Sequence, residues 1–277
     1  MAYIELKGIG KSYGSRSVLQ GVNLSVEQGE FVSIVGPSAS GKTTLLSIAA
    51  GLRGADRGSV TIGGREVTGF SKEAAFVFQN YSLLPWFSAL ENVRLAVEAV
   101  HPEWSKSKQT SHAQSYLEMV GLGQAGGKRP TQLSGGMRQR VAIARAFAVE
   151  PQVLFLDEPL GALDALTRAT LQQELAQLCS SVGRPVTAIL ITNSVDEAIL
   201  LSDRILALSR GPGATLGPAV PVNLPKPRTA QMLLHDEAAV RIRGRVIEFL
   251  TGNSRPADAP ARKDSGAVTQ VVAEVRA

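Results

Sequence analysis

Apolar runs along this chain are short, and they alternate with segments whose apolar positions repeat at helical spacing. Residues 31–35, 153–156 and 188–191 are almost entirely apolar, which is typical of strands covered on both faces. An apolar-periodic helix follows the first run, and a second helix is predicted to begin near Ser194, after the third. Strands that alternate with helices in this way predict an α/β fold with a parallel sheet.

The pattern divides the chain into an expected cassette of residues 1–220 and a smaller C-terminal part. Residues 1–80 begin with an antiparallel-leaning stretch, and residues 151–210 return to strands and helices of the core. Between them, residues 81–150 are mostly helical in pattern and predict a helical subdomain. The polar stretch 101–112 is interpreted as a loop between two of its helices.

The C-terminal part of the chain changes in composition. Residues 211–228 are rich in Pro and Gly, which predicts an extended connector. Residues 232–250 can form one amphipathic helix with Arg241 and Arg245 on its solvent side. We therefore expect a connector and helix over 221–251, followed by a disordered tail over 252–277.

Composition and charge narrow the class of protein only partly. The chain has 44% hydrophobic residues and 5% aromatic residues, which suits an α/β protein with a sizeable core. We expect neither a membrane span nor a signal peptide, because long apolar runs and a basic, then apolar leader are missing. The single cysteine, Cys179, is expected to be a small buried residue in a reducing cytosol. The net charge of +5 leaves nucleic acid, phosphate ligands or an anionic membrane surface open.

The strongest single motif is GPSASGKT at residues 36–43, between the first apolar strand and its helix. It matches G-x-x-x-x-G-K-[ST] in the strand–loop–helix context of a phosphate-binding loop. Loop amides and the helix N-terminus can hold phosphate oxygens, Lys42 can reach the β- and γ-phosphates, and Thr43 can bind Mg²⁺. The predicted ATP-binding residues of this loop are Gly36, Pro37, Ser38, Ala39, Ser40, Gly41, Lys42, Thr43 and Thr44.

Two adjacent acids, Asp157 and Glu158, end the strand at 153–156. Because side chains alternate along a strand, the two carboxylates cannot share one environment. Asp157 can hold Mg²⁺ through its water shell, while Glu158 can polarise the attacking water. A solvated acidic turn is the alternative reading.

The segment LSGGMRQR, residues 133–140, places a serine and two glycines before a helix predicted at 141–149. This is a second anion site, which makes sense if it serves a nucleotide held mainly by another subunit. The segment resembles the signature motif of ABC transporter ATPases, in which two cassettes dimerise head to tail and each ATP lies between one phosphate loop and the opposite signature. The resemblance gives that role to Leu133, Ser134, Gly135, Gly136 and Met137.

The resemblance covers about residues 3–210, with the family motifs in order. It implies a P-loop NTPase cassette with a RecA-like parallel-sheet core, an antiparallel β subdomain and a helical subdomain. It also implies that Tyr13 stacks on adenine, that Gln79 senses Mg²⁺ and the attacking water, and that Asp164 belongs to a loop coupling the two sites across the dimer. The implied Mg²⁺ ligands are Thr43, Gln79 and Asp157, and the implied catalytic residues are Glu158, Gln79 and Asn193.

Asn193 departs from the family, which usually has a histidine at this position. Asparagine can donate an amide N–H to a phosphate oxygen, but it cannot exchange a proton near neutral pH as imidazole can. Its side chain indicates either a weakened hydrolysis site or a tolerated substitute in an active enzyme. Ala39 is a second departure, where the family often has glycine, and we treat it as minor.

The segments LPW at 84–86 and ALENV at 89–93 look like the importer branch that moves nitrate, sulfonates and taurine. Residues 208–217 and 225–228 look most like the nitrate, nitrite or cyanate subgroup. The resemblance thus implies an ATP- and Mg²⁺-dependent ATPase subunit of a small-anion importer, peripheral on the cytoplasmic face of the cell membrane. Its implied partners are membrane permease subunits, a second cassette in a homodimer or heterodimer, and indirectly a solute-binding protein.

Two other classes of function stay open at this stage. One is an importer ATPase for sulfonates or taurine. The other is a soluble cassette ATPase acting on ribosomes or DNA. Such soluble proteins usually carry two cassettes or a long coiled coil, which one set of motifs in 277 residues does not provide. We therefore expect no nucleic-acid partner.

Overall fold

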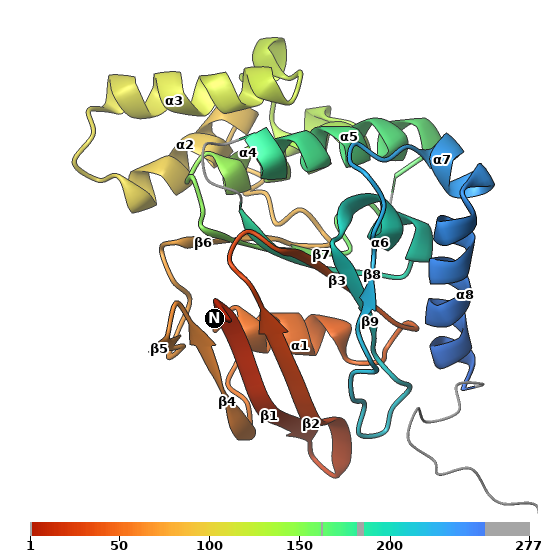
Figure 1. Ribbon diagram of the computed structural model, residues 1–277. Coiled ribbons are helices and arrows are strands. Elements are labelled where there is room, and N and C mark those ends of the chain that lie inside the picture. The colour runs from red at the N-terminus through yellow and green to blue at the C-terminus, as the bar shows by residue number, and fades with distance from the viewer. Residues whose placement is uncertain (1, 162, 182–185, 253–277) are drawn as a thin grey trace, which may run out of the picture.

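The computed structural model describes residues 2–161, 163–181 and 186–252, which form two sheets, with most of the helices packed on the larger one (Figure 1). The strands are β1 (Ile4–Tyr13), β2 (Arg16–Val26), β3 (Phe31–Val35), β4 (Arg57–Ile62), β5 (Arg65–Glu66), β6 (Ala74–Val77), β7 (Val153–Asp157), β8 (Thr187–Thr192), β9 (Arg204–Ala207) and β10 (Val220–Pro221). The helices are α1 (Lys42–Ala49), α2 (Ala89–Val100), α3 (Lys106–Met119), α4 (Gly135–Phe147), α5 (Ala165–Ser181), α6 (Val195–Leu201), α7 (Ala230–His235) and α8 (Glu237–Thr251). Two short 3₁₀ turns, η1 (Gly123–Ala125) and η2 (Pro130–Gln132), precede α4.

The larger sheet has the strand order β10-β9-β3-β8-β7-β6, and all its strands but β10 run parallel. In register, Val35 of β3 lies beside Thr192 of β8, and Asp157 of β7 lies beside Ile191. The carboxyl ends of these strands therefore meet at one edge, where open α/β sheets bind ligands. The predicted α/β fold is confirmed.

The apolar runs are explained by a core on each face of this sheet. Along β7, Leu154 and Leu156 belong to one buried cluster, while Val153 and Phe155 belong to another. Successive side chains on a strand point to opposite faces. A strand that is buried on both faces is therefore apolar throughout, instead of alternating apolar and polar residues. One cluster lies under the helices α2 to α5, and the other lies under α1 and the smaller sheet.

The smaller sheet is antiparallel, with the order β2-β1-β4-β5. Figure 1 shows α1 beside its strands and beneath the parallel sheet. Leu45 and Leu46 of α1 are buried in one cluster with Ile4 of β1 and Ile34 of β3. The helix that follows the phosphate loop is therefore enclosed by both sheets.

Two predicted boundaries in the helical region are wrong. The expected loop at 101–112 ends at Ser105, whose side chain accepts a hydrogen bond from Lys108 N (3.2 Å) and starts α3. Polar residues of the expected loop lie inside this helix. One of them, Gln109, donates through its side chain to the carbonyls of His101 and Trp104. Likewise α4 begins at Gly135 rather than at 141, because a serine cap starts it earlier than its apolar periodicity does.

The C-terminal region also differs from its prediction. Residues 211–228 are not only a connector, since β10 pairs with β9 and Ala214 bridges Leu19. The single helix expected over 232–250 is broken into α7 and α8 at Asp236. The side chain of Asp236 accepts hydrogen bonds from Ala238 N and Ala239 N and so caps α8. A local cap here outweighs continuous apolar periodicity.

Three further predictions concern the exposure of Arg241 and Arg245, the burial of Cys179 and the C-terminal tail. Arg241 and Arg245 are exposed, as expected. Cys179 is buried, and burial raises the pKa of its thiol to about 12. The predicted tail lies almost wholly outside the described residues. Among the helices in the described ranges, none combines the length and the apolarity required to cross a membrane.

Candidate functional site

The phosphate loop joins β3 to α1 through a tightly packed turn. Gly41, at the start of α1, has φ 102, and a Cβ at this position would lie 2.8 Å from Val18 Cγ1. Only glycine suits this place, for both its conformation and its space. Ala39 also has a positive φ, 62, where a side chain is strained. Ala39, which we regard from the sequence as a minor change, therefore occupies a backbone conformation that favours glycine.

An open cavity of about 470 Å³ lies in front of this loop. The predicted residues that line it are Tyr13, Ser38, Ala39, Ser40, Gly41, Lys42, Thr43, Thr44, Gln79 and Glu158. The Ser40 hydroxyl is buried and has no hydrogen-bond partner in the described structure. An unpartnered buried hydroxyl in this loop suits a ligand rich in oxygen atoms, such as a phosphate.

Lys42 lies on the floor of the cavity and is 4% exposed. Its ammonium donates to the carbonyls of Gly36 (3.0 Å) and Pro37 (3.1 Å) and to Asn193 Oδ1 (2.7 Å). Glu158 Oε1 is 3.4 Å away and supplies the opposite charge. A buried ammonium with these partners is satisfied in the absence of a ligand.

Asn193 connects the two charged residues of the site. It accepts from Lys42 through Oδ1, and its Nδ2 donates to Glu158 Oε2 (2.9 Å). An amide can do both at once because it carries an acceptor and a donor on one rigid group. Asn193 is therefore the bridge between Lys42 and Glu158.

Asp157 and Glu158 do have different surroundings. Asp157 is buried, and its Oδ1 accepts from Thr43 Oγ1 (3.1 Å). Burial raises the pKa of Asp157, and the hydrogen bond from Thr43 opposes that shift. Glu158 has φ 44 and turns toward the cavity, where Gln79 Nε2 lies 3.5 Å from its Oε2.

Thr43, Asp157 and Gln79 present hydroxyl, carboxylate and amide oxygens near the cavity, which are the hard donors that Mg²⁺ prefers. The described residues contain no cluster of three His, Cys, Asp or Glu side chains able to hold a metal by themselves. Mg²⁺ is commonly bound by one or two protein ligands together with substrate phosphates, so the residues fit such an ion.

The signature segment lies apart from this cavity. Ser134 caps α4 by accepting from Met137 N (3.2 Å), and none of the residues at 133–137 lines the cavity. Gly136 of α4 packs closely on Thr167 of α5: a Cβ at position 136 would lie 2.7 Å from Thr167 Cγ2. A larger residue at 136 would therefore push the two helices apart. Asp164 caps the start of α5 by accepting from Thr167 N (3.0 Å).

Some residues of the site were not anticipated from the sequence. Arg16, Ser17, Val18 and Gly211 also line the cavity. Arg16 lies opposite Tyr13 in the β1–β2 hairpin. A hairpin predicted from the short spacing between these two residues would have placed Arg16 near the site. Tyr13 itself is 42% exposed and accepts from Arg53 Nη1 (2.5 Å).

The fold and the loop define a P-loop nucleotide-binding protein of the α/β class. The profile of the family described as ABC transporter matches residues 19–161, and the chain belongs to the family of ABC transporter ATP-binding proteins. The resemblance read from the signature motif is thereby confirmed.

Named relatives support the same assignment. The chain is 45% identical to the bicarbonate transport ATP-binding protein CmpC of Synechococcus elongatus, over 88% of this chain and 37% of that protein. It is 41% identical to CmpD of Synechocystis sp., over 90% of this chain and 89% of that protein. It is 42% identical to the nitrate import ATP-binding protein NrtD of Synechococcus elongatus, over 90% and 91%. The chain thus spans little more than a third of the length of CmpC.

A solved structure of similar fold is a dimer of the ATP-binding cassette MJ0796 in a post-hydrolysis state, bound to ADP and Pi. Its TM-score is 0.70 at 32% sequence identity, and the match covers 80% of this chain and 99% of that one. The predicted cassette architecture is confirmed by this likeness.

Proposed function

We propose that this chain hydrolyses ATP as the Mg²⁺-dependent ATPase subunit of an importer for a small inorganic anion. The observation that carries the proposal is the contact of Asn193 with both Lys42 and Glu158, two residues that line the cavity. It joins a phosphate-binding ammonium to a carboxylate that faces the ligand space. This pairing is what phosphoryl transfer to water requires.

Binding of ATP exchanges the partners of Lys42. The γ-phosphate replaces Glu158 as the anion near its ammonium, which favours binding because a charge-assisted contact is kept. Glu158 is then free to orient the attacking water, with Asn193 donating to either anion. Tyr13 at the rim offers its ring face to the adenine base.

Thr43, Asp157 and Gln79 are the residues that would hold Mg²⁺ beside the phosphates. When bound, the ion neutralises charge on the β- and γ-phosphate oxygens. Thr43 and Asp157 are already linked by a hydrogen bond, so both oxygens are in place on one side of the cavity.

The start of α4, where Ser134 is exposed, supports a second cassette as a partner. Residues Leu133–Met137 lie outside the cavity, so they contact nucleotide only if it is bound by another subunit. The dimeric cassette of similar fold supports this pairing. Because this chain has Asn193, we favour a heterodimer with a related cassette that has histidine at the corresponding position. The site built on this chain's phosphate loop would then hydrolyse ATP more slowly than the other site. Asp164 is proposed to couple the two sites.

Membrane permease subunits are the proposed second partner, through the surface around 79–86, and a solute-binding protein participates indirectly. Trp86 is 62% exposed on this surface. The chain would then lie on the cytoplasmic face of the cell membrane. The relatives are named for bicarbonate and for nitrate, so both anions support the proposal, and we keep nitrate as the first candidate.

The test is uptake of labelled nitrate and of labelled bicarbonate by cells that carry the native chain, the Lys42→Ala variant or no chain. We expect uptake of one of the two anions to depend on the native chain and to be lost with Lys42→Ala. The contradicting result is uptake of both anions that does not depend on the chain, although the purified chain hydrolyses ATP. It would point instead to a soluble cassette ATPase or to a sulfonate importer.

A further inference from the structure

The helix α6 begins directly after Asn193, and the C-terminal part of the chain holds both of its ends. Figure 1 shows α6 between the parallel sheet and α8. Buried residues of all three elements, such as Ile199, Ile205 and Ile242, share one apolar cluster. This cluster packs the C-terminal helices against the helix that follows the catalytic strand β8.

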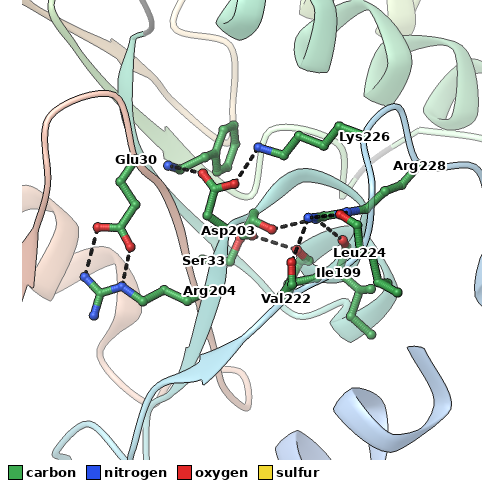
Figure 2. A network of polar contacts seen from close by, with 12 residues as sticks. Glu30, Ser33, Ile199, Asp203, Arg204, Val222, Leu224, Lys226 and Arg228 are labelled. Atoms are coloured by element: carbon green, nitrogen blue, oxygen red, sulfur yellow. Dashed lines mark hydrogen bonds and ion pairs between the residues drawn. The ribbon is translucent and has the colours of Figure 1, made fainter. Parts of the chain in front are cut away.

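At the C-terminal end of α6 the contact is made by Arg228, which is buried. Its Nη1 donates to the carbonyls of Ile199 (2.7 Å) and Ser202 (2.6 Å). Its other N–H groups donate to the carbonyls of Val222 and Leu224, as Figure 2 shows. The last carbonyls of a helix have no partner within it, so one guanidinium satisfies the end of α6 and ties it to the segment after β10.

At the N-terminal end of α6 the contact is made by Arg243 of α8. Its Nε lies 2.8 Å and its Nη2 2.7 Å from Asp196 Oδ1, in the first turn of α6. Nη2 also donates to the carbonyl of Leu233 in α7 (3.3 Å). Arg243 therefore links α6, α7 and α8 at one point.

The first turn of α6 in turn fixes the backbone on either side of Asn193. Ser194 Oγ accepts from Glu197 N (3.2 Å), and Thr192 Oγ1 accepts from Ser194 N (3.1 Å). The Thr192 hydroxyl is also hydrogen-bonded to the buried carboxyl group of Glu197. Asn193 is held between two residues that are both bonded to the start of α6.

We propose that Arg228 and Arg243 are positioning residues for Asn193, which act by clamping α6 at its two ends. The proposal rests on the proposed function only in giving Asn193 its role between Lys42 and Glu158. Loosening the clamp lets the first turn of α6 fluctuate, so Asn193 bridges the two charges for a smaller part of the time. Hydrolysis slows, while ATP binding by the phosphate loop is kept.

The gentle variant is Arg243→Gln, and Asp196→Asn removes the same ion pair from the other side. Arg241→Gln is the matched control, because Arg241 is on the same helix and forms its ion pair with the exposed Glu237. Arg228→Lys is the stronger variant, since three donors on a single nitrogen cannot serve four carbonyls in different directions. If Arg228→Lys fails to fold, Arg243→Gln still tests the proposal.

The first measurement is hydrogen exchange of the full chain without nucleotide. We expect Arg243→Gln and Asp196→Asn each to raise exchange over residues 192–199 by about two- to fivefold, as loss of a partly exposed ion pair does. Exchange over 42–49 should stay as in the native chain, and Arg241→Gln should change neither segment. Unchanged exchange over 192–199, or an equal rise with Arg241→Gln, would overturn the clamp.

The second measurement is steady-state ATP hydrolysis and binding of a fluorescent ATP analogue. We expect Arg243→Gln to lower kcat by about two- to fivefold with KM and analogue affinity unchanged. In an Asn193→Ala background the same substitution should have no further effect, because Arg243 acts through Asn193. An additive loss would assign Arg243 a general structural role. Native chain that neither binds nor hydrolyses ATP would refute the proposed function, while the exchange result would still test the clamp.

Discussion

The two glycine-containing helix starts of this chain, at α1 and at α4, differ in what satisfies them. At α1, Gly41 has no side chain to cap the helix, and an open cavity lies in front of the buried Lys42. At α4, the exposed Ser134 caps its own helix by accepting from Met137 N. The first start lies beside a buried Ser40 hydroxyl that has no partner in the described structure, whereas at the second a side chain of the same segment caps the helix.

A glycine-containing motif alone does not determine the surroundings of a helix start. Both starts offer backbone N–H groups and the positive end of a helix dipole. Of the two, α1 alone carries a buried ammonium, that of Lys42, with two carboxylates and an amide brought close to the helix start from β7 and from the residues that follow β7 and β8. The carboxylates and the amide beside Lys42 therefore come from distant parts of the chain.

The largest expected effect belongs to Glu158. Glu158→Gln should slow hydrolysis by about 10²- to 10⁴-fold, because an amide cannot take a proton from water. ATP binding should persist and the ATP-loaded dimer should accumulate, which single-turnover assays and sedimentation measure. Glu150→Gln is the matched control, since Glu150 is also a glutamate with positive φ near β7. Native turnover by Glu158→Gln would remove Glu158 from the mechanism.

The comparison of the two helix starts is tested by a pair of substitutions. Lys42→Ala should weaken ATP binding to the monomer by about 10- to 100-fold, the loss of a charge-assisted contact. Ser134→Arg should leave monomer binding unchanged and block ATP-dependent dimerisation. Fluorescent-ATP titration and sedimentation separate the two outcomes.

The control for Ser134→Arg is Ser105→Arg. Ser105 caps α3 with a hydrogen bond of the same length, 3.2 Å, so both variants lose one helix cap. Ser105→Arg should still dimerise with ATP. If Lys42→Ala and Ser134→Arg weaken monomer binding equally, the signature segment does not act on a partner's nucleotide.

A smaller effect is expected at Asn193. Asn193→His should raise hydrolysis by about tenfold, since imidazole can exchange a proton near neutral pH where an amide cannot. It should also add a pH dependence near pH 6.5 that the native chain lacks. Rates measured from pH 6 to pH 8 test both points. A fast native homodimer that Asn193→His leaves unchanged would contradict the idea that this is the weaker site of a heterodimer.

The smallest effect is on stability. Burial raises the pKa of Asp157 in the folded chain, so the folded state favours the protonated carboxyl group. Native stability therefore falls as pH rises from the unfolded pKa through the folded one. Asp157→Asn should avoid this loss and raise the free energy of unfolding by about 1 kcal/mol at pH 7.5, with no gain near pH 4.

Urea unfolding at the two pH values measures this, and Asp164→Asn gives a contrast of opposite sign. Hydrogen bonds from Thr167 lower the pKa of Asp164, so its contribution to stability is present at neutral pH and is lost as pH falls. Equal behaviour of the two variants would show that burial of Asp157 is not what separates the two sites.

Much of the fold and of the site was predictable, because motifs and apolar runs are local. The strand before the phosphate loop, the strand before Asp157 and the helix after Ser194 all lie where the pattern places them. The errors occurred where a single polar side chain decides a boundary. Ser105 begins α3 early, and Asp236 divides one amphipathic pattern into two helices.

By itself, the sequence determined the class of fold, the family and the residues that gather at the carboxyl edge of the sheet. These follow from short-range spacing and from the order of strands. Only the tertiary structure decided that Asn193 bridges Lys42 and Glu158, that Ala39 has a left-handed backbone conformation, and that Arg228 and Arg243 hold α6. The physical reason is distance along the chain: Asn193 and Lys42 are 151 residues apart, and only packing of the two sheets and α6 brings an amide within 2.7 Å of an ammonium.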